Sequence, residues 1–188
     1  LGELFPDGDT LADASADALL ERFLDYTAGK GLTLYPAQEE AILELLDEKN
    51  VILNTPTGSG KSLVASAMLF SSLARGQRAI YTCPIKALVN EKWMALCREF
   101  GPDQVGLATG DATVNRDAPI QVEVAEILWN RIVGEKHVNP AELVIMDEGH
   151  YFNDLERGYV WEQSIIGLDP RTQLVILSAT VGHPERFC

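Results

Sequence analysis

Short apolar runs alternate along the chain with longer segments in which apolar residues recur at helical spacing. Short runs bounded by glycine, proline or polar residues are typical of buried strands, whereas the longer pattern indicates amphipathic helices. The predicted strands cover residues 51–54, 78–83, 104–108, 119–124, 142–146 and 172–177. The predicted helices cover residues 13–27, 36–46, 63–74, 89–100, 125–133 and a segment around 160–165.

Strands that alternate with helices in this way predict an α/β fold, with a mostly parallel sheet and helices on both faces. In such sheets ligands bind beyond the carboxyl ends of the strands, so polar residues that directly follow a strand are the candidates for function. Residues 1–31 are expected to form an N-terminal arm and a packing helix, and residues 32–188 to form the domain itself.

The first such turn predicts a phosphate-binding P-loop. Strand 51–54 leads into a turn with two glycines, and an alanine-rich helix follows. Glycine lets successive backbone N–H groups approach a phosphate, and the positive end of the helix dipole lies at the same point. Lys61 would reach the β and γ phosphates, and the Ser62 hydroxyl would coordinate Mg²⁺. The remaining residues of the turn are Thr55, Pro56, Thr57, Gly58, Ser59 and Gly60.

Two adjacent carboxylates follow the strand at 142–146. Asp147 is expected to hold Mg²⁺ through water, and Glu148 to orient and deprotonate an attacking water. His150 comes two residues later, and the small hydroxyl residues Ser178 and Thr180 follow the last strand. We expect these hydroxyl groups to bond to the His150 ring and to pass the state of the nucleotide site to the rest of the domain.

Gln38 lies on the first turn of the helix that precedes the P-loop strand. Its amide presents a donor beside an acceptor, which complements the N6 and N7 edge of adenine. A P-loop by itself would fit a kinase, a GTPase, a transporter ATPase or a helicase, so the assignment depends on these further residues.

The charge distribution limits how the chain could bind nucleic acid. Residues 1–50 hold 12 acidic and 3 basic residues, and residues 51–188 hold 16 and 12, giving a net charge of −13. A broad basic face is therefore absent from the sequence, and the usual electrostatic contribution to nucleic-acid affinity is expected to be small. No stretch approaches the ~20 apolar residues that span a bilayer, so we expect a cytoplasmic protein with no membrane partner.

The segments in this order resemble the first RecA-like domain of a superfamily two helicase, a DExH-box protein of the superkiller type. The resemblance implies a RecA-like P-loop NTPase fold. It is carried by residues 35–38, 55–62, 84–88, 109–111, 125–128, 147–150, 154–162 and 178–180.

The resemblance implies an ATP-dependent helicase that uses ATP and Mg²⁺ and moves 3′ to 5′ along a single strand, RNA in preference to DNA. Arg157 and Gly158 would shape the turn beside Asp147. Contacts to phosphates and sugars need few net positive charges. The residues expected along the strand are Pro84, Lys86, Thr109, Gly110, Asp111 and Glu126.

Three features depart from the family pattern. Val124 stands where relatives often carry threonine, and Leu32 where many carry an aromatic residue that stacks on adenine. No second RecA-like domain follows within the 188 residues, so we expect a fragment that is nearly inactive without that partner domain.

Two alternatives stay open at this point. A DNA helicase of the same superfamily would use the same motifs, since none of these residues reads a 2′-hydroxyl uniquely. A nucleotide-binding interaction module without catalysis would also keep the fold, although the intact Lys61, Ser62, Asp147 and Glu148 argue against it. A P-loop kinase is disfavoured because no lid or acceptor site is apparent.

Overall fold

The computed structural model describes residues 15–55, 60–134 and 140–179. Within these ranges the strands form one seven-stranded sheet in the order β1-β7-β6-β2-β5-β3-β4. The pairings are parallel except that of β3 with β4. The strands are β1 (Val51–Asn54), β2 (Ala79–Cys83), β3 (Val105–Ala108), β4 (Thr113–Val114), β5 (Ile120–Val124), β6 (Leu143–Met146) and β7 (Gln173–Ser178).

The helices agree with the sequence prediction in number and order across the described ranges, and a short 3₁₀ helix, η2 (Gly149–Asn153), was not predicted. Helix α4 begins at Lys86, three residues earlier than expected. The six predicted strands are all present, and β4 is an additional short strand. The helices are α1 (Ala16–Gly29), α2 (Pro36–Leu46), α3 (Lys61–Ala74), α4 (Lys86–Phe100), α5 (Ala125–Gly134) and α6 (Gly158–Gly167).

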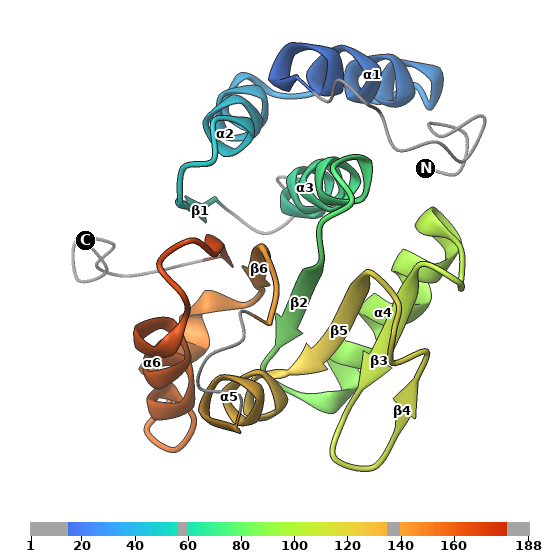
Figure 1. The fold of residues 1–188 in the computed structure, drawn as a ribbon. Helices are drawn as coiled ribbons and strands as arrows, with labels where there is room; N and C mark the ends of the chain where they lie inside the picture. The colour runs from blue at the N-terminus through green and yellow to red at the C-terminus, as the bar shows by residue number, and fades with distance from the viewer. Residues whose placement is uncertain (1–14, 56–59, 135–139, 180–188) are drawn as a thin grey trace.

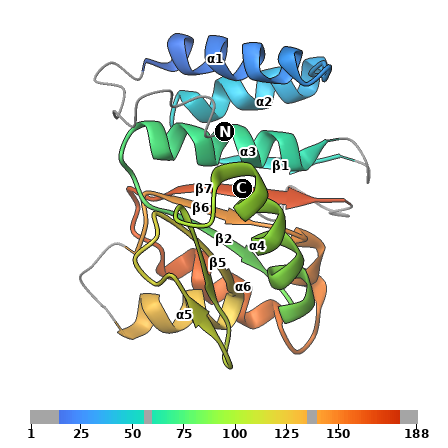
Figure 2. The ribbon, with the colours of Figure 1, turned by 90° about the vertical axis from the view of Figure 1, so that its right-hand side faces the viewer.

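The sheet is covered on both faces, as predicted. Alternate residues of its strands point to opposite sides, so Tyr81 and Ile145 join one hydrophobic cluster and Ile80 and Val144 join the other. The first cluster includes residues of α1 to α4, and the second includes residues of α5 and α6. Figure 2 shows the layers edge on, with α1 and α2 stacked above α3, the sheet below α3, and α5 and α6 underneath.

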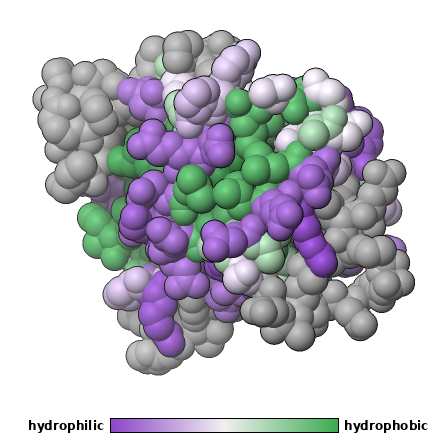
Figure 3. Space-filling view, turned by 90° about the horizontal axis from the view of Figure 1, so that it is seen from above, coloured by the Kyte–Doolittle hydropathy of each residue, from purple (hydrophilic) through white to green (hydrophobic). Residues whose placement is uncertain are grey.

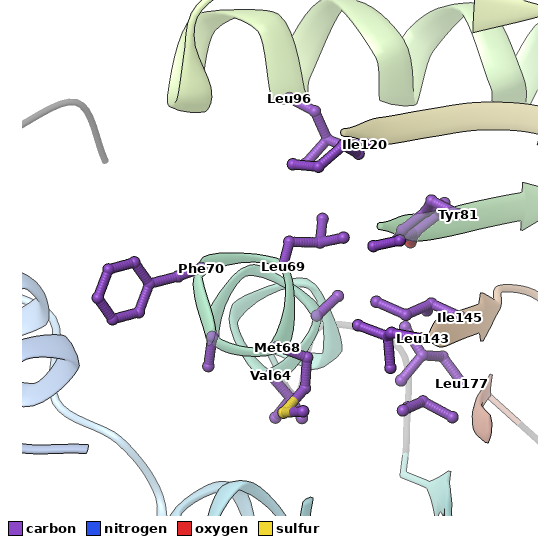
Figure 4. Packing of buried hydrophobic residues seen from close by; sticks show 14 of the residues in the cluster. Val64, Met68, Leu69, Phe70, Tyr81, Leu96, Ile120, Leu143, Ile145 and Leu177 are labelled. Carbon is purple, nitrogen blue, oxygen red and sulfur yellow. The ribbon is translucent and has the colours of Figure 1, made fainter. Parts of the chain in front are cut away.

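Helix α3 lies between the sheet and the outer pair α1 and α2 (Figures 1 and 2). Most of its side chains are therefore buried, which explains why its sequence is apolar on every face. Figure 4 shows Leu69 directed toward the sheet residues Tyr81 and Ile120, and Phe70 directed away from them. The Phe70 ring stacks on Phe23 of α1 with centroids 6.5 Å apart. The P-loop helix is thus fixed from two sides.

Helix α1 shares the core of the domain, because Leu19 and Phe23 are each 1% exposed within the main cluster. The predicted packing helix therefore belongs to the same hydrophobic core, whereas the predicted arm at 1–10 lies outside the described residues. Apolar surface bordered by polar residues is visible on the side where α1 and α2 lie (Figure 3). Leu32 and Leu43 are 48% and 42% exposed.

No helix within the described residues combines the length and the apolar character needed to cross a bilayer. The cytoplasmic location expected from the sequence stays a prediction.

Candidate active site

The parallel strands bring their carboxyl ends to one edge of the sheet. Asn54 of β1 is paired with Ser178 of β7, and Met146 of β6 with Ile176 of β7. The backbone continues this pairing past the strand, because the Thr55 N–H donates to the Ser178 carbonyl at 3.2 Å. The segment that begins the P-loop and the one that ends β7 therefore lie side by side.

Gly60 is the last residue before helix α3 and has a left-handed backbone with φ 77°. A Cβ atom there would lie 2.0 Å from Gln38 Nε2. Glycine is required at this position by both the backbone angle and the close approach of Gln38. Pro56, Thr57, Gly58 and Ser59 lie outside the described residues.

Lys61 and Ser62 open helix α3, directly after Gly60. The Lys61 ammonium donates to the Thr55 carbonyl at 2.7 Å, so the side chain reaches back over the start of the P-loop. Ser62 is exposed. Both groups therefore lie where the helix dipole is positive, at the edge predicted from the sequence.

Gln38 is 5% exposed and connects α2 to the P-loop. Its Oε1 accepts the Tyr35 N–H at 2.7 Å, and its Nε2 donates to the Gly60 carbonyl at 3.1 Å. The orientation of the Gln38 amide is thus fixed by the backbone of Tyr35 and of Gly60. A cavity of about 390 Å³ adjoins Gln38, with Leu32 and Leu63 among its lining residues. Its size and position suit a nucleotide base.

Asp147 follows β6, and three groups contact or approach its carboxylate. Oδ1 accepts the Glu148 N–H at 2.8 Å, and Oδ2 accepts the Tyr81 hydroxyl at 2.5 Å. The Lys92 ammonium lies 3.7 Å from Oδ2. The Asp147 N–H donates to the Thr82 carbonyl of β2 at 2.9 Å. The carboxylate orientation is therefore fixed by β2 and α4.

Lys92 is the residue that connects the two motifs. Its ammonium lies 3.5 Å from the Ser62 hydroxyl and 3.7 Å from Asp147 Oδ2. The P-loop serine and the acidic residue after β6 therefore face the same cation. A hydroxyl and a carboxylate oxygen are ligands that Mg²⁺ accepts, and Mg²⁺ sites commonly use one or two carboxylates together with substrate phosphates.

Glu148 has a left-handed backbone, with φ 59° and ψ 47°. Such strain in a residue other than glycine is concentrated at functional positions. Next to it, a Cβ atom at Gly149 would lie 2.7 Å from Ile176 Cγ2, so glycine is needed for β7 to pass close by. This sharp turn keeps Glu148 at the sheet edge together with Asp147.

His150 lies next to Glu148, with Nδ1 3.2 Å from Glu148 Oε2. That close approach lacks hydrogen-bond geometry, and Nδ1 has no bond within the described residues. The expected bond from Ser178 is not formed either, because the Ser178 hydroxyl is buried without a partner there. Ser178 packs instead against Gly149, whose Cβ position would be 3.3 Å from the serine Cβ. Thr180 lies outside the described residues.

Burial raises the pKa of two further groups beneath Asp147. The pKa of the Tyr81 hydroxyl is well above its ordinary value because the group is buried and because Asp147 is negative. Burial likewise raises the pKa of the Cys83 thiol, with Asp147 adding to the effect. Tyr81 therefore remains protonated at neutral pH and donates to Asp147.

The residues expected along a nucleic-acid strand lie at the ends of β2, β3 and β5. Lys86 at the start of α4 forms an ion pair with Asp111, which follows β3. The Pro84 carbonyl accepts the Arg157 guanidinium at 2.8 Å, so the segment after Asp147 is tied to the end of β2. A Cβ atom at Gly158 would lie 2.4 Å from the Phe152 carbonyl oxygen, so the two backbones pass very close to each other.

Thr109, Gly110 and Glu126 complete this half of the edge. Thr109 is 8% exposed, and its hydroxyl accepts the Ala112 N–H at 3.2 Å, which closes the turn that contains Gly110. Glu126 is exposed in the first turn of α5. Apart from Gln38 on α2, the described residues expected at the nucleotide follow β1, β6 and β7. Those expected along a nucleic-acid strand follow β2, β3 and β5, on the adjoining half of the same sheet edge.

Comparison with known proteins identifies the family. A family model described as DEAD/DEAH box helicase matches residues 35–187. The chain belongs to this family. Its relatives are DExH-box proteins, which confirms the superkiller-type resemblance, and members of the family use ATP, usually with Mg²⁺.

Three relatives illustrate the match. The chain is 40% identical over 160 residues to the DExH-box ATP-dependent RNA helicase DExH15, chloroplastic, of Arabidopsis thaliana, covering 80% of this chain and 13% of that protein. It is 42% identical over 156 residues to the ATP-dependent RNA helicase mtr4 of Schizosaccharomyces pombe, covering 82% and 14%. It is 39% identical over 171 residues to the probable helicase HelY of Mycobacterium tuberculosis, covering 90% and 18%.

A solved structure with the same fold is that of the UvsW helicase from bacteriophage T4. It superposes with a TM-score of 0.64 at 19% identity, covering 83% of this chain and 57% of that one. The match confirms the RecA-like α/β fold. The chain spans less than a fifth of the length of the curated relatives described above.

Sequence reasoning did not find Tyr81 and Lys92 at this DEAD/DEAH box site. Tyr81 fits the pattern of a buried strand residue, and Lys92 fits that of a polar helix residue, so neither differs from its neighbours in type. Their roles come from contacts with residues 66 and 30 positions away in sequence, respectively. A tyrosine in an otherwise small and apolar strand was the one available signal, because a buried hydroxyl needs a partner.

Glu123 is a buried acidic residue of β5. Its side chain has no exposed surface, and Oε2 accepts the Arg131 guanidinium at 3.0 Å. Burial raises its pKa to about 7, against the opposing effect of Arg131. The folded state therefore favours the protonated form of Glu123. The stability that the folded state gains from this protonation at low pH is lost as pH rises from about 4.5 through about 7.

We predict that Glu123→Gln reduces this pH dependence. Between pH 4.5 and 8 the wild-type free energy of unfolding should fall by up to about 3 kcal/mol more than that of the variant. Urea denaturation at several pH values measures the difference. Parallel stability curves for the two proteins would contradict the prediction.

Proposed function

We propose that this chain is the N-terminal motor domain of an ATP-dependent RNA helicase. Mg²⁺-ATP binds beyond β1, β6 and β7, and single-stranded RNA binds beyond β2, β3 and β5. The observation that carries the proposal is that Ser62 and Asp147 face the same cation, Lys92. Two motifs that are far apart in sequence then bind the same triphosphate, as hydrolysis by this family requires.

Each residue of the nucleotide site has its own proposed role in hydrolysis. Lys61 neutralises charge on the β and γ phosphates, and Gln38 with the adjoining cavity receives the base. Ser62 and Asp147 would hold Mg²⁺, which when bound would supply positive charge to the phosphate oxygens. Glu148 orients the attacking water and accepts its proton, and its left-handed backbone beside Asp147 supports that placement. His150 adjoins Glu148, with Nδ1 3.2 Å from its carboxylate.

The strand contacts are proposed for the backbone of the nucleic acid. Lys86 contacts a phosphate, and its ion pair with Asp111 is exposed and can open at little cost. Pro84, Thr109, Gly110 and Glu126 line the same path. Recognition of phosphates and sugars is compatible with an acidic chain, because it depends on local groups and not on net charge. Movement from 3′ to 5′ rests on the superkiller-type resemblance.

RNA is preferred over DNA because two of the relatives described above are named as RNA helicases. A DNA helicase of the same superfamily is the second candidate. The two are separated by ATP turnover measured with RNA and DNA strands of equal length and sequence, in a protein that joins this chain to a second RecA-like domain. We expect RNA to stimulate turnover at least about tenfold more than DNA, and equal or greater stimulation by DNA would contradict the RNA assignment.

A second RecA-like domain is the proposed partner in the parent protein. It would supply the other half of the ATP cleft, including the arginine that stabilises charge on the transferred phosphate. The shares of 13% to 18% covered in the relatives leave ample length for such a domain. Coupled movement along RNA is proposed only for the two domains together.

A further inference from the structure

Lys92 lies midway along α4, and its ammonium occupies the gap between the Ser62 hydroxyl and the Asp147 carboxylate. Its side chain is 23% exposed, and its ammonium lies 5.2 Å from the centre of the Tyr81 ring. The same ammonium approaches the Ser62 hydroxyl and the Asp147 carboxylate. Each of these three neighbours presents electron-rich atoms to one positive charge.

The position of this ammonium coincides with the proposed metal position. Ser62 and Asp147 are the side chains assigned to Mg²⁺, and both already face Lys92 at 3.5 and 3.7 Å. Two cations a few ångströms apart repel each other strongly in a partly buried site. Lys92 and Mg²⁺ therefore compete for the same oxygen atoms.

Tyr81 fixes the orientation of the Asp147 carboxylate during this competition. Its hydroxyl donates to Asp147 Oδ2, the same oxygen that Lys92 approaches. The carboxylate consequently keeps its orientation toward the gap when the neighbouring cation changes. Burial of a carboxylate without a cation would be costly, so one positive charge has to remain beside Asp147.

We propose that Lys92 is the resident counter-cation of the metal site. It neutralises Asp147 before nucleotide binds, and it leaves the gap when Ser62 and Asp147 take Mg²⁺. Lys92 thereby raises the Mg²⁺ concentration at which nucleotide binds. It is a positioning residue that acts through Asp147 and Ser62, and the proposal rests on the nucleotide site described under the proposed function.

The test measures binding of a fluorescent ADP to this chain at increasing Mg²⁺ concentrations. Lys92→Met removes the charge and keeps most of the apolar stem, whereas Lys92→Arg keeps the charge. We expect Lys92→Met to lower the half-saturating Mg²⁺ concentration about tenfold or more. Lys92→Arg should stay within about threefold of wild type. Arg98→Met is the matched control, because it removes a positive charge from an exposed position of the same helix.

An unchanged or higher Mg²⁺ midpoint in Lys92→Met would overturn the proposal, since the side chain would then be neutral toward the bound state or support it. That result leaves the nucleotide site intact, provided that wild type binds and Lys61→Ala does not. Failure of wild type to bind Mg²⁺-nucleotide at any concentration would refute the proposed function as well.

Thermal unfolding in EDTA gives a second readout that requires no nucleotide. Lys92→Met should lower the melting temperature by about 2–4 °C when Asp147 is present, because it leaves that carboxylate without a cation. In an Asp147→Asn background the same substitution should have almost no effect. An equal fall in melting temperature in both backgrounds would show that Lys92 contributes to stability only through packing. That result would overturn the proposal.

Discussion

Lys61→Ala and Glu148→Gln are each expected to lower strand-stimulated ATP turnover by at least about a thousandfold, in a protein that joins this chain to its second RecA-like domain. Alanine removes the ammonium that is proposed to contact the phosphates. Glutamine keeps the size of Glu148 but cannot accept a proton from water. Phosphate release at saturating ATP and RNA is the measurement.

Two exposed substitutions serve as controls for this experiment. Lys49→Ala removes a lysine whose side chain is 54% exposed, in an ion pair with Glu44, and Glu40→Gln removes an exposed carboxylate from α2. Both should keep turnover close to wild type. If Lys61→Ala and Glu148→Gln also kept turnover within about tenfold, the assigned roles would be wrong.

The second large effect concerns the chain by itself. The 188-residue chain is expected to bind Mg²⁺-nucleotide but to hydrolyse ATP about 10³–10⁵-fold more slowly than the two-domain protein. The physical reason is that the described residues proposed to bind the phosphates lie at one sheet edge, whereas the transferred phosphate needs positive charge from the opposite side as well. Single-turnover hydrolysis, with protein in excess over ATP, compares the two proteins directly.

Lys61→Ala in the isolated chain provides the baseline for that comparison. Turnover in the wild-type chain should approach this baseline, and unwinding of an RNA duplex with a 3′ overhang should be undetectable. Unwinding at a rate comparable to that of the two-domain protein would show that no partner domain is needed.

The positions of the residues proposed to bind nucleotide could be predicted because their motifs are local. A strand followed by a glycine turn and Lys61 specifies a P-loop from neighbouring residues, and the apolar run before Asp147 specifies a buried strand with acids at its end. Parallel strands then bring both motifs to one edge. The sheet and its helical layers followed from the same alternation of periods.

The errors and omissions concern features that depend on distant contacts. Strand β4 has only two exposed residues and no apolar run, so its pairing with β3 leaves no periodic signal. The contacts of Tyr81 and Lys92 with Asp147 arise only when β2, α4 and β6 come together. The bond expected between Ser178 and His150 failed because the close packing of β7 against Gly149 decides where Ser178 lies.

A crystal structure of this chain with Mg²⁺ and a non-hydrolysable ATP analogue tests the central claim most directly. We predict one metal ion about 2.1 Å from the Ser62 hydroxyl, with Asp147 in contact directly or through one water. Lys61 should reach the β and γ phosphates of the same nucleotide. A metal bound at Ser62 with Asp147 turned away and more than about 8 Å distant, or a nucleotide bound elsewhere on the domain, would contradict the account.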